Sequence, residues 1–186
     1  MSNKTEKLTV SPMASATIRA FRQVDINSEQ VFKIRSVKTG KPVEVKARSL
    51  YENEKVVLSK AFDFIENKLK GSSIEEDIQI LMKATGFFIT GSPHIGAYSV
   101  IREDTPMVFL NKNLFSWSND EFAVTVLHEL LHFINISGDD KTGDSLEEAM
   151  HDFECYRLLG ISVPPEHWAW KKYPQLKDEL LSDSAG

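Results

Sequence analysis

Two histidines and a glutamate inside an apolar segment are the residues of this chain best suited to chemistry. They are His128, Glu129 and His132, and the positions around them in Val124–Ile134 are almost all apolar. On a helix, residues i and i+4 lie on one face, so both imidazoles can reach one tetrahedral zinc ion. Glu129 lies at the edge of the same face, where its carboxylate can take a proton from a water molecule.

The HExxH spacing of these residues is the zinc-binding and general-base motif of metalloproteases. The apolar neighbours predict a core helix, in which polar side chains without partners would be strongly destabilising. The alternative explanation is a pair of core histidines satisfied by hydrogen bonds, with Glu129 at a surface edge. We expect a zinc site instead, with Glu129 as the catalytic residue and Zn²⁺ as the cofactor.

A catalytic zinc site has three protein ligands, so the two histidines need a third partner. Glu148 and Asp152 are four residues apart on a later predicted helix, so Glu148 could bind the metal while Asp152 orients a histidine from behind. Glu147 and His151 form a competing pair with the same spacing. We predict Glu148 as the third ligand and His151 as the alternative. The weaker candidates are Glu147 and three loop aspartates, Asp139, Asp140 and Asp144.

A capping role competes with the metal role at Glu148. The pattern Ser145-Leu-Glu-Glu148 is a capping box, in which the Glu148 carboxylate would bond to the backbone of Ser145. If Asp144 and Glu147 fill that role, Glu148 is free to reach a metal. Spacing alone leaves both arrangements open.

Length and composition restrict the class of protein. The 186 residues allow one domain with at most a small added module, and 41% hydrophobic residues suffice for a sizeable core. A net charge of −5 argues against nucleic-acid binding by the whole chain. A single cysteine, Cys155, excludes an internal disulfide and reads as a small buried hydrophobe. With no long apolar run and no signal-peptide pattern, we expect a cytoplasmic protein without a membrane partner.

Three parts follow from the patterning along the chain. We predict a flexible N-terminal arm over 1–30, a basic β-hairpin over 31–48, and a main domain over 49–186 with an aromatic C-terminal segment. A solvated surface is the simpler interpretation of the hairpin's basic face, and a docking patch for an acidic partner or a nucleic-acid backbone is the other. This face carries Lys33, Arg35, Lys38, Lys41, Lys46 and Arg48 against Glu44 alone.

The main domain is predicted to be α+β. Ser-x-x-Glu capping boxes start four predicted helices, and glycines end two of them. The boxes begin at Ser49, Ser73, Ser118 and Ser145, and the terminating glycines are Gly71 and Gly160. Strands are predicted over 87–90, 97–101 and 107–111. We expect a small, mostly antiparallel sheet packed on the motif helix and on the following ligand helix.

This order of elements resembles the zincin metallopeptidase core, and most closely the compact gluzincin-type peptidases of the ImmA/IrrE kind. The resemblance covers roughly 74–160: strands that end at Asn111, the LHELLH helix, and the helix with Glu148. It implies His128 and His132 as zinc ligands, Glu129 as general base and Glu148 as third ligand. The family's Glu-Ala-Asn-x-Phe-Ala run is present only loosely, with Phe153 displaced, which leaves a SprT-like arrangement with a later third histidine open. No metzincin-type pattern follows, since Asn135 and Gly138 stand at its glycine and histidine positions.

The function that the resemblance implies is a zinc metallopeptidase acting on a specific intracellular protein, with a regulatory protein as a further partner. Glu129 would take a proton from water and pass it to the leaving amine, and strand 97–101 or 107–111 would pair with the peptide. The alternatives are a catalytically silent zincin-fold binding or regulatory protein, and a hydrolase acting on another bond. An extra oxyanion donor is also expected; its candidates are Tyr156, His151, His167 and His94.

Overall fold

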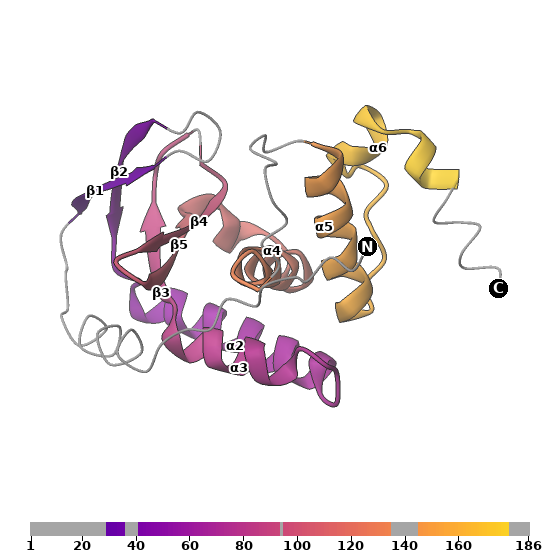
Figure 1. The fold of residues 1–186 in the computed structure, drawn as a ribbon, viewed down its shortest axis with the longest axis horizontal. Helices are drawn as coiled ribbons and strands as arrows, with labels where there is room; N and C mark the ends of the chain where they lie inside the picture. Colours follow the sequence, from indigo (N-terminus) through magenta and orange to yellow (C-terminus); the bar gives the residue numbers. More distant parts are fainter. Residues whose placement is uncertain (1–28, 36–40, 94, 135–144, 179–186) are drawn as a thin grey trace, which may run out of the picture.

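The structure, a computed structural model, describes residues 29–35, 41–93, 95–134 and 145–178 as a five-stranded sheet with helices over one face (Figure 1). The α+β prediction is therefore confirmed. The strands are β1 (Gln30–Arg35), β2 (Pro42–Arg48), β3 (Gly86–Thr90), β4 (Ala97–Arg102) and β5 (Thr105–Asn111). The helices are α2 (Glu52–Leu69), α3 (Glu75–Ala84), α4 (Asn119–Leu131), α5 (Leu146–Leu159), α6 (Trp168–Lys172) and the short 3-10 helix η1 (Lys112–Ser116). Nearly all of the predicted arm and the loop 137–144 lie outside the described residues.

The sheet has the strand order β1-β2-β3-β5-β4. Among the described strands only β3 and β5 pair in parallel, and the other three neighbouring pairs are antiparallel, in agreement with the mostly antiparallel sheet predicted. The three predicted strands of the main domain are all present within one or two residues of their expected bounds. Of the two strands considered for peptide pairing, β4 lies at the edge and β5 lies between β3 and β4.

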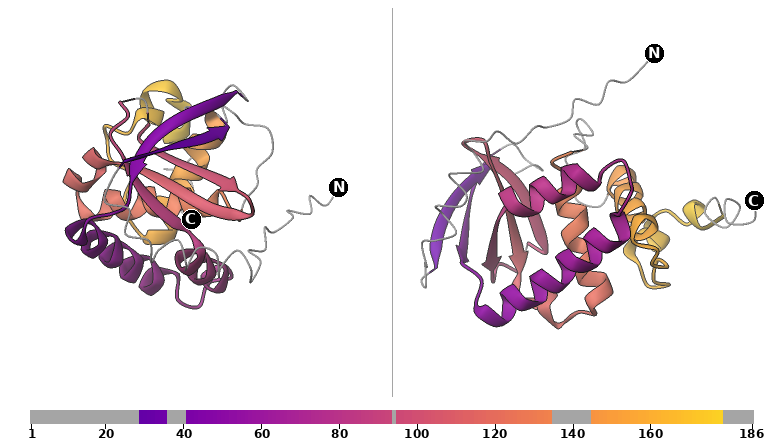
Figure 2. Two further views of the ribbon diagram at one scale, coloured as in Figure 1. Left: turned by 90° about the vertical axis from the view of Figure 1, so that its left-hand side faces the viewer. Right: turned by 90° about the horizontal axis from the view of Figure 1, so that it is seen from below.

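The alternation of side chains along the strands builds a core on each face of the sheet. Val108 and Leu110 of β5 pack with the helices, whereas Phe109 packs on the opposite face. There the β1–β2 hairpin crosses over the other strands of the sheet (Figure 2). The Phe32 ring centroid lies 5.3 Å from that of Phe109 and 4.9 Å from that of Phe88. The predicted hairpin is thus an integral part of the sheet.

Two charged residues of the hairpin differ from the predicted basic face. Lys33 lies directly opposite Glu44, which reduces the local charge. Arg48 turns inward, where its guanidinium binds the Glu54 carboxylate with distances of 2.7 and 3.1 Å. Arg48 therefore ties β2 to the start of α2 and does not belong to an exposed patch.

Helices α4 and α5 begin as their sequences predict, and α5 also ends as predicted. Ser118 Oγ accepts a hydrogen bond from the Glu121 N–H (3.3 Å), and Ser145 Oγ accepts one from the Glu148 N–H (3.1 Å). Gly160 ends α5 with φ +66°, a left-handed conformation that glycine adopts without strain.

Among the described residues, no helix has the length and apolar character needed to cross a membrane.

The starts of α2 and α3 contradict the predicted capping boxes. The residue before α2 is Tyr51, whose N–H donates to the Glu54 carboxylate (2.8 Å), so Ser49 is not the cap. The residue before α3 is Ile74, and Glu75 instead accepts from the Gly71 N–H (2.6 Å). In both cases an acidic residue of the first turn satisfies a backbone donor upstream, which moves the start by one or two residues.

Candidate metal centre

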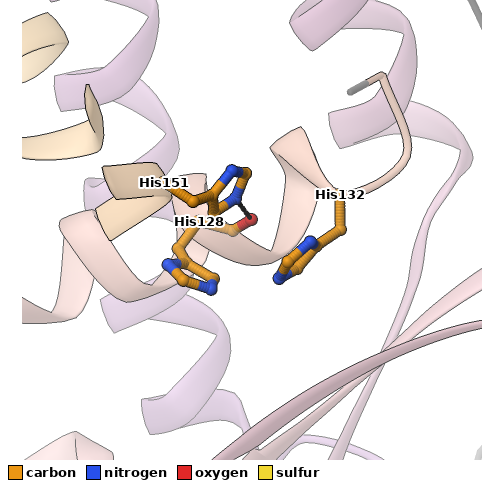
Figure 3. Close-up of side chains that lie close together, drawn as sticks. All are labelled: His128, His132 and His151. Carbon is orange, nitrogen blue, oxygen red and sulfur yellow. Dashed lines mark hydrogen bonds between the residues drawn. The ribbon is translucent and has the colours of Figure 1, made fainter. Parts of the chain in front are cut away.

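Helices α4 and α5 pack side by side and bring three imidazoles together (Figure 3). His128 and His132 come from the C-terminal end of α4, and His151 comes from α5. One ring nitrogen of each lies within 4.8 Å of the others. The His151 ring stacks on His132 (centroids 4.3 Å apart, 14° between planes) and meets His128 edge to face. This cluster and the carboxylates around it form the candidate metal centre.

The Glu148 carboxylate faces the same nitrogen of both histidines on α4. Its Oε2 lies 2.9 Å from His128 Nε2, and its Oε1 lies 3.4 Å from His132 Nε2. In a tetrahedral zinc site with bonds of about 2.0–2.2 Å, neighbouring ligand atoms are about 3.3–3.6 Å apart. The distance to His132 Nε2 therefore has the spacing that a single zinc ion requires, and the shorter distance to His128 Nε2 is that of a hydrogen bond. Ser145 caps the backbone at Glu148, and this leaves the carboxylate free to face the histidines.

His151 is close enough to take part but is oriented differently. Its Nε2–H donates to the backbone carbonyl of His128 (2.9 Å), as the dashed line in Figure 3 shows. That nitrogen cannot bind a metal unless the hydrogen bond breaks, because one nitrogen cannot donate its proton and its lone pair at once. Both predicted third ligands thus lie at the centre, and Glu148 is the one already aligned with both Nε2 atoms.

Asp152 lies behind His128, on the side away from Glu148. His128 Nδ1 donates to Asp152 Oδ1 at 2.9 Å, so the lone pair of the neutral ring is on Nε2, which faces the centre. Burial raises the pKa of Asp152, but hydrogen bonds from His128 and His167 outweigh it and hold the pKa well below its usual range. Asp152 therefore carries a negative charge beside the ring, which makes Nε2 a stronger donor to a cation.

Glu129 is almost fully buried, with 6% of its surface exposed. Ser99 Oγ of β4 contacts both its carboxylate and its backbone carbonyl, the latter at 3.1 Å. Burial raises the pKa of Glu129 and outweighs the opposing effects of His128 and of the Ser99 hydrogen bond. Ser99 is not among the site residues predicted from the sequence, although it is the polar residue between Ala97 and Ile101 on one face of the strand.

The carboxylates make the centre a site for positive charge. Burial lowers the pKa of His128, but hydrogen bonds with Asp152 and Glu148 outweigh it and raise the pKa to about 10. Burial and the neighbouring charged His128 lower the pKa of His132 to about 3. Without a metal, His128 therefore carries a second proton and a positive charge. The three carboxylates around it stabilise this charge, and the neighbouring imidazole rings are neutral. A divalent cation bound to Nε2 of both histidines would satisfy the same negative groups.

The remaining predicted candidates have different surroundings where the structure describes them. The Glu147 side chain is exposed, and Cys155 is buried in the apolar core as a small hydrophobe. His167 was predicted as an oxyanion donor but lies behind Asp152, with its Nε2 bonded to that carboxylate. Tyr156 is buried beside His167, with ring centroids 5.8 Å apart. His94 and the three loop aspartates are outside the described residues.

Comparison with known proteins identifies no relative. No family model matches the chain, and no curated protein and no solved structure matches it either.

Proposed function

We propose that this chain is a zinc-dependent metallopeptidase with a zincin-like core of the compact gluzincin type. The observation that supports this most directly is the Glu148 carboxylate lying against Nε2 of both His128 and His132. These three residues would hold the zinc, and Asp152 would orient His128 from behind. A zinc ion bound there would supply Lewis-acid chemistry: a lower pKa for a water molecule and a polarised scissile carbonyl.

Glu129 is the residue proposed to move the proton. It follows the first histidine, its carboxylate is buried, and Ser99 fixes the orientation of one of its oxygens. The pKa of its carboxyl is raised in the direction of neutral pH, and a general base is most effective when its pKa is near the working pH. Glu129 would accept a proton from water and donate it to the amine of the departing peptide.

The edge strand β4 is the proposed binding site for the substrate backbone. Within the part of the chain that the structure describes, β4 pairs only with β5, so its other edge can pair with an extended peptide. Ser99 of this strand contacts Glu129, so a peptide along β4 would pass the proposed general base. The substrate class that fits is an extended segment of an intracellular protein, presented alone or by a regulatory partner.

The test is the substitution Glu129→Gln, which keeps the size of the side chain and removes its basicity. We expect kcat to fall about 10²–10⁴-fold, the usual contribution of general acid–base catalysis. The zinc content should stay near one per chain. The assay is hydrolysis of a proteome-derived peptide mixture, read by mass spectrometry. Glu147→Gln, at an exposed glutamate, is the matched control. Hydrolysis at the wild-type rate by Glu129→Gln would refute the mechanism.

A second candidate function is supported by the position of His151. Its ring nitrogen is within reach of the two histidines of α4. If His151 and Glu148 both bound the metal, four protein ligands would close the site, as in structural zinc centres. The protein would then be a catalytically silent binding or regulatory protein. Cobalt-substituted protein distinguishes the two, because an open site changes its visible spectrum when a hydroxamate is added and a closed site does not.

The basic hairpin should be tested in this second case by surface substitutions. Deleting it would uncover Phe88 and Phe109, so the truncated chain would report on folding and not on binding. Lys33 and Lys46 are exposed on the hairpin, and their replacement by glutamate reverses charge without touching the core. If these variants lose a binding partner of the wild type, and zinc has the same effect on the variants as on the wild type, the regulatory function is favoured.

A further inference from the structure

We infer that His167 is a positioning residue for the metal centre, which holds Asp152 and, through it, the imidazole of His128. This inference rests on the proposed function, since it concerns how the same zinc ligands are oriented. His167 belongs to the segment after α5, well away from the HExxH motif in sequence. Through Asp152 of α5, His167 connects the C-terminal segment to His128 of α4.

The hydrogen bonds of His167 fix which of its nitrogens carries the proton. Its Nδ1 lies 3.2 Å from the Ala169 N–H, which can only donate, so Nδ1 is the acceptor. The proton of the neutral ring is therefore on Nε2, which donates to Asp152 Oδ2. The other oxygen of Asp152 accepts from His128 Nδ1 at 2.9 Å. One carboxylate is thus held at both oxygens, by a ring on each side.

The surroundings of His167 leave it no direct role at a substrate. Only 7% of its side chain is exposed. Its ring lies among aromatic rings, with centroids 5.3 Å from Phe153, 5.8 Å from Tyr156 and 5.6 Å from Trp168. A ring packed in this way keeps its orientation, which is what a fixed donor to Asp152 requires.

The expected effect of losing this contact is moderate. A residue that hydrogen-bonds directly to a metal-binding histidine typically changes metal affinity about 10–100-fold when replaced. His167 acts one contact further away, and the Asp152 side chain keeps 18% exposure, so water can partly replace the lost donor. We therefore expect zinc affinity to fall about 3- to 10-fold, less than for direct partners.

Two substitutions separate the functions of the two nitrogens. His167→Asn keeps an acceptor near Nδ1 for the Ala169 N–H but is too short to donate to Asp152. His167→Gln places an amide N–H near the former Nε2 and should restore the bond to Asp152. Zinc affinity, measured by competition with a chromophoric chelator, should fall in the Asn variant and return toward wild type in the Gln variant. If both variants bind zinc like wild type, the inference is wrong.

A double-mutant cycle tests whether His167 acts through Asp152. In an Asp152→Ala background, His167→Asn should cause little further loss of zinc affinity, because the residue it positions is gone. An equal loss in both backgrounds would overturn the inference. Trp170→Phe is the matched control for mere structural damage. It removes the bond from Trp170 Nε1 to the Pro164 carbonyl (2.8 Å) in the same segment, so it should lower Tm and leave zinc affinity unchanged.

A readout in the metal-free protein is independent of zinc and keeps the two proposals distinguishable. Long-range ¹⁵N spectra should show His167 protonated at Nε2 and not at Nδ1, and the opposite tautomer would overturn the inference. If wild-type and Glu129→Gln proteins bind zinc but neither hydrolyses peptides, the proposed function fails while the affinity series still decides the role of His167. A wild-type protein that binds no zinc would refute both.

Discussion

The two faces of the sheet have opposite chemical character. The face on which the hairpin packs has a hydrophobic cluster at its centre, including the rings of Phe32, Phe88 and Phe109. The helix-covered side also contains an apolar core, but buried within it are Glu129 and the polar groups around it. Buried charge is costly unless it is paired, and a core is stable without it. The difference suggests that one face serves stability and that the other gives up some stability for chemistry.

The largest expected effect is on the apolar face. Phe109→Ala removes a fully buried ring that contacts two others, and should lower the free energy of unfolding by about 3–5 kcal/mol. Urea unfolding followed by circular dichroism measures it, with Val31→Ala on the exposed hairpin surface as control. The folded fraction should bind zinc with wild-type affinity. If zinc affinity falls in parallel with stability, the two faces are not separate and the comparison fails.

The next effect concerns the third ligand and is expected in metal affinity. Glu148→Ala should weaken zinc binding by at least about 100-fold, the upper end of losses seen for residues that only orient a ligand. His151→Ala should weaken it much less, because its Nε2 is bonded to the His128 carbonyl. Metal analysis after dialysis against a weak chelator separates the two. The reverse order would identify His151 as the ligand, and Glu148 would then be a charged neighbour.

The third effect is a pH dependence of zinc binding. With a pKa of about 10, His128 is protonated at pH 7.5 in the metal-free protein, so zinc must displace that proton to reach Nε2. Affinity should therefore rise about tenfold per pH unit up to pH ~10 and then level off. Calorimetry in two buffers of different ionisation enthalpy should show about one proton released per zinc.

Asp152→Asn is the control for this measurement. It removes a carboxylate that raises the pKa of His128, so less proton should be released at the same pH. If the wild type releases no proton when it binds zinc, His128 is not charged in the metal-free centre.

The sequence predicts well those contacts that depend on a short spacing along the chain. His128 and His132 are four apart on a helix, so their proximity follows from the 3.6-residue turn. Their partners in the structure are not predictable in this way, because Ser99 contacts a residue 30 positions away and His167 contacts one 15 positions away. Such contacts depend on how the edge strand and the C-terminal segment pack on the helices, and local patterning carries no information on this.

The four Ser-x-x-Glu patterns show the same limit on a smaller scale. At Ser118 and Ser145 the serine hydroxyl caps the helix as predicted. At Ser49 the pattern fails because Glu54, held by Arg48, takes the backbone N–H of Tyr51. A pattern thus states which hydrogen bond is available, and a residue outside the pattern decides whether it forms.

The smallest expected effect tests the contact that joins the edge strand to the general base. Ser99→Ala removes one hydrogen bond, worth about 0.5–1.5 kcal/mol, so kcat/KM should fall roughly 2- to 10-fold. The Ser99 bond lowers the pKa of Glu129, so its loss should raise that pKa and move the acidic limb of the pH–rate profile to higher pH. Ser99 Oγ also contacts the Glu129 backbone carbonyl and so ties β4 to α4, and a purely structural role would lower Tm without moving the profile. A shifted limb would place Ser99 with the buried polar groups that serve chemistry, whereas an unshifted limb with reduced Tm would place it with the residues that serve stability.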